Sequence, residues 1–324
     1  MEEVNSMIRA RDSSRKGSVR KTHHQMKGPV FKELYKQIKK GDLTAVVSYN
    51  NYIRSLLSIH QDSRGILNWD DFREIPEPKL PLRPSLNQDI AEEEYKAYQP
   101  TMLDKILGQR KKKLSDLMKN TEQAKRDDDL IYNASLKEFK NDHQEWKKGQ
   151  LIAVGVKNKE PVAYQQAIEF FEPFKQILQL GAKVDCESFT DYIIAHLNFH
   201  WAEVIPDYMV TQTAAGKVLS SQMPDLKFNE ICHHHVCASA LRTGREIFAL
   251  LPIGCVLVHA YANLPDKKTG SAQKKIILSV KFTRTALQEL NFSTLNGPDF
   301  FPGFPHHMDF SVEDGFLPTQ PLSN

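Results

Sequence analysis

Residues 223–252 read MPDLKFNEICHHHVCASALRTGREIFALLP, and this stretch decides the fold. The pattern predicts one helix of about 25 residues, with Asp225 as its N-cap directly after Pro224. A single long helix of this kind packs across a sheet when strands flank it in the sequence. The segments before and after this helix do have the patterns of strands.

Five segments, three before the helix and two after it, have the composition and alternation of β-strands. They are FTDYIIAHLNFHW (189–201), EVIPDYMVTQT (203–213), GKVLS (216–220), CVLVHAYA (255–262) and KKIILSVKF (274–282). Their order predicts an α+β domain over residues 182–295, in which a mixed or mostly antiparallel sheet packs on one long helix. Residues 296–324 show no period and are expected to form an irregular tail.

The N-terminal half has helical periodicity. Residues 29–181 repeat apolar side chains at helical spacing, and four prolines near 76–84 predict a stiff, extended linker within this helical region. Residues 101–149 are dense in charge and predict an arm of two or three long, coiled-coil-like helices. Such helices suit contact with a partner protein or with a second copy of the chain.

Positive charge is concentrated at the N-terminus. The whole chain of 324 residues has a formal net charge of +3, whereas residues 1–40 carry eleven Lys or Arg against four Asp or Glu. Residues 1–28 bury too little apolar surface to fold alone and predict a basic, disordered tail. This tail either remains solvated or contacts nucleic-acid phosphates. The residues expected to make such contacts are Arg15, Lys16, Arg20 and Lys21.

No apolar segment has the form of a signal peptide or the length of a membrane-spanning helix. The longest apolar run, residues 247–262, is interrupted by Pro252, Gly254 and His259. It is also shorter than the roughly 20 residues that a spanning helix needs. Four cysteines in a chain without a signal peptide are typical of reduced thiols. We therefore expect a cytoplasmic protein that does not enter a membrane.

Several stretches resemble a family of uncharacterised bacterial proteins. They are YNNYIRSLLSIHQDSRGILNWDDF (49–72), MPDLKFNEI (223–231), REIFALLPIGCVLVHA (245–260), ILSVKFTRTALQELNF (277–292) and HHMDFSVEDGF (306–316). The resemblance implies a bacterial origin and implies that the two halves of the chain act as one unit. It implies no reaction, substrate or catalytic residue.

The run CHHHVC at residues 232–237 suggests a zinc site. Consecutive helical residues point about 100° apart, so the three histidines cannot all reach one ion. His233 with Cys237 has workable spacing, as does His234 with Cys237, but structural zinc needs two more ligands from another element. Candidates for those ligands are Cys186, His196, His200, Cys255 and His259. Because no tight second pair completes the ligand set, the favoured interpretation is that Cys232 and Cys237 are small buried core residues and that the histidines are partly exposed polar positions.

A metal-dependent nuclease is the enzymatic alternative. Such an enzyme holds Mg²⁺ with carboxylates near a lysine. The sequence places Glu203 and Asp207 in one predicted strand and Lys281 in another, although Ser279 stands where an acid two positions before the lysine is needed. We therefore expect first a bacterial cytoplasmic binding or interaction protein that is a component of a larger assembly. A nucleic-acid-cleaving enzyme is the second expectation.

Overall fold

The computed structural model describes residues 29–265 and 271–323. The described chain forms two units: Trp69–Val154 is the smaller one, and the remaining described residues form the larger one. The expected helical region 29–181 is therefore not a unit by itself, because its two ends belong with the sheet. The basic tail 1–28 lies outside the described residues. So do its candidate phosphate contacts Arg15, Lys16, Arg20 and Lys21.

A six-stranded mixed sheet forms the centre of the larger unit. Its strand order is β1-β2-β5-β6-β7-β8, with β2 and β5 parallel and every other neighbouring pair antiparallel. The strands are β1 (Ala182–Ser188), β2 (Tyr192–Phe199), β5 (Cys255–Pro265), β6 (Ala272–Thr283), β7 (His306–Ser311) and β8 (Gly315–Leu317). The predicted α+β class, with a mixed sheet packed on one long helix, is confirmed.

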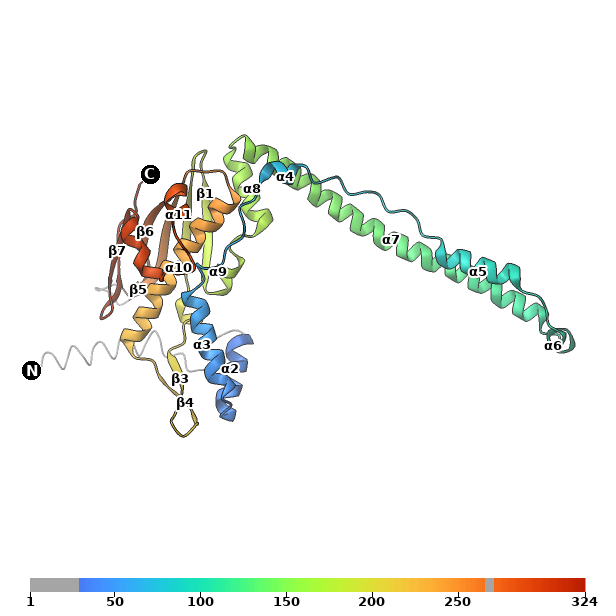
Figure 1. Ribbon diagram of the computed structural model, residues 1–324, viewed down its shortest axis with the longest axis horizontal. Coiled ribbons are helices and arrows are strands. Elements are labelled where there is room, and N and C mark those ends of the chain that lie inside the picture. Colours follow the sequence, from blue (N-terminus) through green and yellow to red (C-terminus); the bar gives the residue numbers. More distant parts are fainter. Residues whose placement is uncertain (1–28, 266–270, 324) are drawn as a thin grey trace, which may run out of the picture. The chain divides into compact units, whose positions relative to one another are not determined.

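Helix α10 (Asp225–Leu250) is that long helix, and it covers one face of the sheet (Figure 1). Its Gly244 lies so close to β6 that a Cβ would come within 2.8 Å of the Phe282 ring. The His235 ring packs edge-on against Phe199 of β2, with 5.6 Å between the ring centroids. These contacts show which side of β2 and β6 faces the helix.

The start of α10 differs from the expectation in detail. Pro224 occupies the N-cap position with extended backbone, Asp225 lies in the first turn, and no side chain caps the helix. An acidic side chain in the first turn is still favourable, because the N-terminus of a helix carries partial positive charge.

Further helices and a separate hairpin complete the larger unit. They are α2 (Pro29–Lys40), α3 (Thr44–Leu57), α8 (Pro161–Phe171), α9 (Lys175–Gln179), α11 (Arg284–Gln288), the 3-10 helices η1 (Trp201–Glu203) and η2 (Gly297–Gly303), and the pair β3 (Tyr208–Gln212) and β4 (Val218–Gln222). Helices α8 and α9 lie against β1, whereas α3 lies against α10 and β3. Helices α3, α8 and α9, which come before and after the smaller unit in the sequence, therefore pack on the sheet or on α10.

Several parts of the larger unit differ from the sequence expectations. The last part of the expected helical region, residues 161–181, forms two short helices, because the chain turns through a left-handed Glu172 (φ 44°) before Pro173. The β3–β4 hairpin pairs outside the main sheet, and β1 was not expected. Residues 296–324 are not irregular, because β7 and β8 extend the sheet by antiparallel pairing.

A buried charge cluster joins α10 to the loop after α3. Glu246, which is 1% exposed, lies 2.6 Å from Arg64 Nε and 2.9 Å from Arg242 Nη2. Arg64 also donates to the carbonyl of Phe171, and Arg242 donates to the carbonyl of Ile59. Removing one member of such a buried cluster leaves an uncompensated charge. The cluster therefore fixes these loops on the helix.

Helix α7 (Arg110–Lys157) is the main element of the smaller unit, which ends within this helix at Val154. The two or three helices expected over 101–149 are mainly this one helix of 48 residues, preceded by the short α6 (Met102–Ile106). Helices α4 (Trp69–Arg73) and α5 (Leu86–Ala97) complete the unit. No helix in either described stretch of the chain is long and apolar enough to cross a membrane.

The proline-rich segment near 76–84 runs along α7 (Figure 1). Trp146 of α7 donates its indole N–H to the carbonyl of Ile75 at 2.8 Å, and Arg83 pairs with Asp129. Proline has no N–H to leave unsatisfied, so an extended segment rich in proline can lie beside a helix without a hydrogen-bonded ladder. Residues 76–84 thus form an extended strap that packs along α7.

Asp128 of α7 caps the neighbouring helix α5. Its carboxylate is 2% exposed and accepts hydrogen bonds from the backbone N–H of Gln88 at 2.9 Å and from the side-chain amide of Asn87 at 2.8 Å. Backbone N–H groups at a helix N-terminus have no partner within the helix. Asp128 therefore supplies from α7 the acceptor that α5 needs.

Candidate functional site

The predicted zinc ligands on α10 lie among apolar groups. The His233 ring stacks on Phe310 with 4.0 Å between ring centroids, and burial lowers the pKa of His233 to about 4. Cys237 is fully buried, and burial raises the pKa of its thiol well above the usual value. Because the thiolate is the form that binds metals, a thiol held protonated in this way is a poor ligand.

No second pair of ligands joins them. In the part of the chain that the structure describes, no group of three or more His, Cys, Asp or Glu side chains could hold a metal ion. His196 and His259 pair in register on β2 and β5. They lie on the sheet face opposite α10, because alternate β2 residues such as Phe199 face His235 of that helix. His233 and Cys237 therefore serve the core.

The three predicted nuclease residues are not brought together. Glu203 ends η1 and Asp207 precedes β3, so neither lies in the strand expected for them. Lys281 of β6 pairs with Leu257 of β5, which in turn pairs with Ile194 of β2. Ile194 lies five positions before Phe199, the last residue of β2, a distance of about 17 Å along a strand. The lysine and the carboxylates are thus far apart, and no shared Mg²⁺ site forms.

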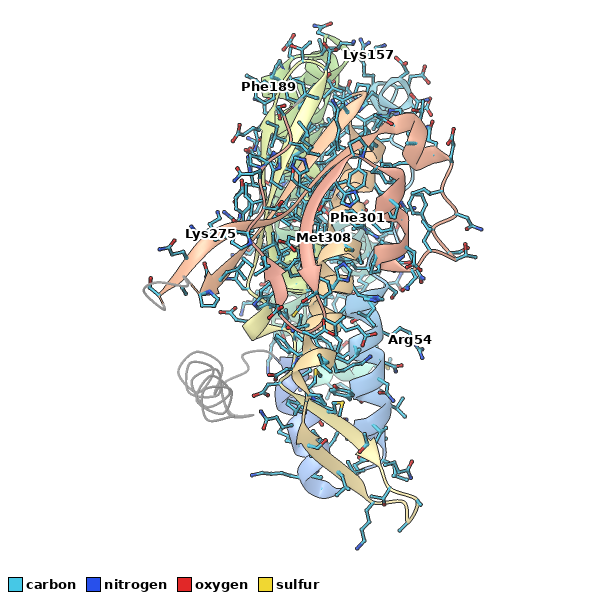
Figure 2. All side chains as sticks on the ribbon, turned by 90° about the vertical axis from the view of Figure 1, so that its left-hand side faces the viewer. Arg54, Lys157, Phe189, Lys275, Phe301 and Met308 are labelled. Atoms are coloured by element: carbon cyan, nitrogen blue, oxygen red, sulfur yellow. The ribbon has the colours of Figure 1, made fainter. Side chains whose placement is uncertain are left out.

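A groove of about 1110 Å³ opens beside the N-terminal half of α10. It is bounded by η1, the end of the β5–β6 hairpin, β7 and β8. Figure 2 shows this hairpin, with Lys275 near its end, reaching beyond the rest of the sheet. The lining residues are Trp201, Phe228, Asn229, Cys232, Leu264, Pro265, Lys275, Asp309, Phe310, Asp314, Gly315, Phe316, Leu317 and Pro318. Pockets for small molecules have volumes of roughly 300–1,000 Å³, so this groove has room for a larger ligand.

A row of aromatic rings forms one wall of the groove. Trp201 stacks on Phe316 with 6.0 Å between ring centroids, Phe316 lies 5.0 Å from Phe310, and Phe310 stacks on His233. These rings come from η1, from both strands of the β7–β8 hairpin and from α10. Aromatic walls supply a large contact area with little loss of side-chain entropy.

The turn between β7 and β8 is anchored to α10. Asn229 donates its side-chain amide to the carbonyl of Val312 at 2.9 Å. Gly315 has φ 74°, and a Cβ there would lie 3.2 Å from the Asn229 side-chain oxygen. Only glycine adopts this backbone conformation without strain and also leaves room for Asn229. This turn of the groove wall is therefore held against α10.

The charged groups of the groove favour a cation, as far as the described residues line it. Among these residues, Asp309 and Asp314 provide two carboxylates, against the single ammonium group of Lys275. Strand β8 is the last strand of the sheet and pairs only with β7 among the described residues. Its other edge carries backbone groups that an extended chain could pair with.

The sequence predictions missed this groove because they treated residues 296–324 as an irregular tail. A signal was present, since residues 306–311 are followed after a short polar turn by Gly315, as in a β-hairpin. No pattern in the sequence relates Trp201 or Phe228 to that hairpin. Their proximity follows from the packing of α10 on the sheet.

Comparisons with protein-family models, with curated proteins and with solved structures found no match for this chain. The resemblance to a family of uncharacterised bacterial proteins therefore stays a prediction. The chemistry of the protein's own surfaces is therefore the basis for inferring its function.

Proposed function

We propose that this protein is a binding protein, and a component of a larger assembly, whose groove takes an extended, basic segment of a partner protein. The single observation that carries the proposal is the aromatic groove beside the edge of β8, with two carboxylates in its lining. Lys or Arg side chains of the partner would lie over the aromatic rings and near Asp309 and Asp314. Backbone groups of the partner would pair with β8.

Charge and shape both support this class of partner. Carboxylates beside aromatic rings attract cations, and an aromatic face adds about 0.5–2 kcal/mol per cation. A groove of about 1110 Å³ is also larger than a drug-sized ligand fills. The nuclease alternative has weaker support, because Glu203, Asp207 and Lys281 do not share a site.

Fluorescence anisotropy with two labelled peptides tests the proposal. One is a six-residue peptide of alternating Lys and Val, and the other replaces each Lys with Glu. We expect the full-length protein to bind the Lys peptide at least about tenfold more tightly, a difference of 1.4 kcal/mol. The double substitution Asp309→Asn with Asp314→Asn should remove most of that preference.

Glu313 provides the matched control. It is exposed in the same turn but does not line the groove, so Glu313→Gln should leave the affinity for the Lys peptide nearly unchanged. Equal binding of the two peptides would contradict the proposal. A loss of affinity in Glu313→Gln as large as in the double variant would also contradict it, because the attraction would then be a general effect of surface charge.

A further inference from the structure

The sheet face opposite α10 carries a second arrangement of polar side chains, independent of the groove. Along β2, Ile193, Ala195, Leu197 and Phe199 are buried on the helix side, and the residues between them point the other way. His196 is one of these, and it pairs in register with His259 of β5. The two rings are neighbours on this face, with 5.8 Å between their centroids.

His196 is held between a carboxylate and a hydroxyl group. Its Nε2 lies 2.9 Å from Glu187 Oε1, and its Nδ1 lies 3.1 Å from Tyr261 Oη. An ionised carboxylate only accepts hydrogen bonds, so Nε2 of the neutral ring carries the proton and Nδ1 is bare. The Tyr261 hydroxyl then donates to Nδ1. This order of carboxylate, imidazole and hydroxyl is the one by which enzymes activate a nucleophile.

Three adjacent strands set this order. Glu187 is on β1, His196 on β2 and Tyr261 on β5, and the register pairs Glu187 with Ile194 and Tyr261 with Asn198. The three side chains are therefore diagonal neighbours on one face, which long side chains can span. The positions are fixed by strands, which hold a reactive geometry more firmly than loops do.

Tyr261 also lines a cavity of about 280 Å³. The other side chains around this cavity include Lys183, Lys274, Asn198 and His200. The ammonium group of Lys274 lies 4.6 Å from the centroid of the Tyr261 ring, whereas Lys183 is paired with Asp185 at 2.8 Å. A lysine in the lining of the cavity that Tyr261 also lines is suited to a phosphoryl group, whose negative charge it offsets.

We propose that Tyr261 is a nucleophile for small phosphodiesters, with His196 as its general base and Glu187 as the group that orients the base. Tyr261 Oη forms a bond to phosphorus, the bond from phosphorus to the leaving alcohol oxygen breaks, and the hydroxyl proton passes to His196 Nδ1. Lys274 offsets the charge on the phosphoryl oxygens. His196 then returns its proton to the leaving oxygen or to solvent.

The second half of the reaction restores the protein. Water attacks phosphorus, the proton of that water passes to His196 Nδ1, and the bond between phosphorus and Tyr261 Oη breaks. The proton on His196 then returns to Tyr261. The products are an alcohol and a phosphate monoester, so one water is consumed for each diester and no metal or redox partner takes part.

The electrostatics of the site make the base necessary. Burial, and then the charge of Glu187, raise the pKa of Tyr261, so its hydroxyl group stays protonated at neutral pH. The hydroxyl can therefore react only when a neighbouring base removes its proton. His196 is the imidazole within hydrogen-bond distance of Tyr261 Oη.

Hydrolysis of bis(p-nitrophenyl) phosphate by the full-length protein tests this proposal. With EDTA present to exclude metal-dependent contaminants, we expect release of p-nitrophenolate, and Tyr261→Phe should lower the rate at least about 100-fold. Tyr192→Phe is the matched control, because Tyr192 lies on the same face of β2 but pairs with Cys255. Its rate should stay at the wild-type value.

One further measurement uses the wild type alone and does not depend on how well a variant folds. Rapid quenching of the wild-type reaction should leave a p-nitrophenyl phosphoryl group on the peptide that contains Tyr261, detected by mass spectrometry. His196→Asn should lower the rate at least about 100-fold, because no base would then take the proton of Tyr261. Absence of release by the wild type, an adduct on another residue, or full activity in Tyr261→Phe would each overturn the proposal.

Discussion

The two long helices of this protein are stable for different reasons. Most of α10 is buried, including the charged side chains of Arg242 and Glu246. In α7, only Asp128 and Gly149 are buried between Arg110 and Gln150. Helix α10 thus depends on tertiary packing, whereas α7 depends on helix-forming residues and on one seam covered by the strap and α5. The comparison teaches that similar helical patterns in a sequence can have very different energetic roles.

The largest expected effect comes from the buried charges of α10. Glu246→Ala leaves Arg64 and Arg242 without their shared partner, so the free energy of unfolding of the larger unit should fall by about 3–5 kcal/mol. Urea unfolding followed by Trp201 fluorescence measures this, in a background with Trp69→Phe and Trp146→Phe.

The control for this prediction is an ion pair on the surface of the same helix. Lys227 and Glu230 are about half exposed and lie 2.9 Å apart, so Glu230→Ala should change the free energy of unfolding by less than about 1 kcal/mol. Equal losses in Glu246→Ala and Glu230→Ala would show that burial of the charge is not what matters in α10.

Gly244→Ala should also destabilise α10. Alanine is the better helix former by about 1 kcal/mol, but its Cβ would lie 2.8 Å from the Phe282 ring. Overpacking of this kind costs about 1–3 kcal/mol, so a net loss of stability is expected in the same urea experiment. Gly254→Ala is the comparison, because no atom lies within 4 Å of a Cβ there. A gain of stability in Gly244→Ala would mean that α10 follows helix propensity, as α7 does.

In the smaller unit, Asp128→Ala should remove the cap of α5. The backbone N–H of Gln88 and the amide of Asn87 would lose their acceptor, at a cost of about 1–2 kcal/mol. Urea unfolding followed by Trp146 fluorescence, with Trp201 replaced by Phe, reports on this unit. Asp127→Ala is the control, since Asp127 is exposed and accepts a hydrogen bond from the side-chain amide of Gln123 within α7 itself. Similar losses of stability in Asp128→Ala and Asp127→Ala would show that the contacts between α7 and α5 add little to the stability of the smaller unit.

The smallest effect is a difference in pH dependence between the units. Burial lowers the pKa of His233 from 6.5 to about 4. As the pH falls, the His233 ring therefore binds a proton in the unfolded chain before it does so in the folded chain. The contribution of the neutral His233 ring to the free energy of unfolding is complete above pH 6.5 and is lost as the pH falls toward 4. For a half-buried ring the loss between pH 7 and pH 5 should be about 1 kcal/mol after solvent screening.

Urea titrations at several pH values test this difference. No histidine among residues 69–154 is buried, so the smaller unit should lack the corresponding fall in stability. His233→Gln should flatten the pH profile of the larger unit. A profile that is unchanged in this variant would show that other buried groups, such as His235, control the acid sensitivity.

Local patterns predicted the elements that carry a strong period. The alternation over residues 192–199 predicted β2, and the segment 223–252 predicted α10 to within a few residues. The arm over 101–149 was correctly helical, but the number of helices was wrong because charge patterning alone does not place a break. Strand β8 is only three residues long, which is too short for a period to be visible.

The candidate sites show the same difference between what local patterns predict and what depends on contacts between elements. The His233 and Cys237 pair was chosen by spacing along one helix, and the structure places His233 against Phe310 instead. The groove and the Tyr261 site were not predicted, because each joins residues from three or more elements. Spacing along the chain carries no information on such neighbours.

The sequence by itself determined the α+β class, the long central helix and the contrast between an apolar C-terminal half and a charged arm. Periodicity and composition are local properties of a segment. The apolar face of a helix or strand can therefore be recognised without knowing which element packs against it. Only the tertiary structure decided that β2 and β5 are parallel neighbours and that residues 306–317 complete the sheet. Strand order depends on contacts between segments far apart in the chain, so it also decided that Tyr261 meets His196.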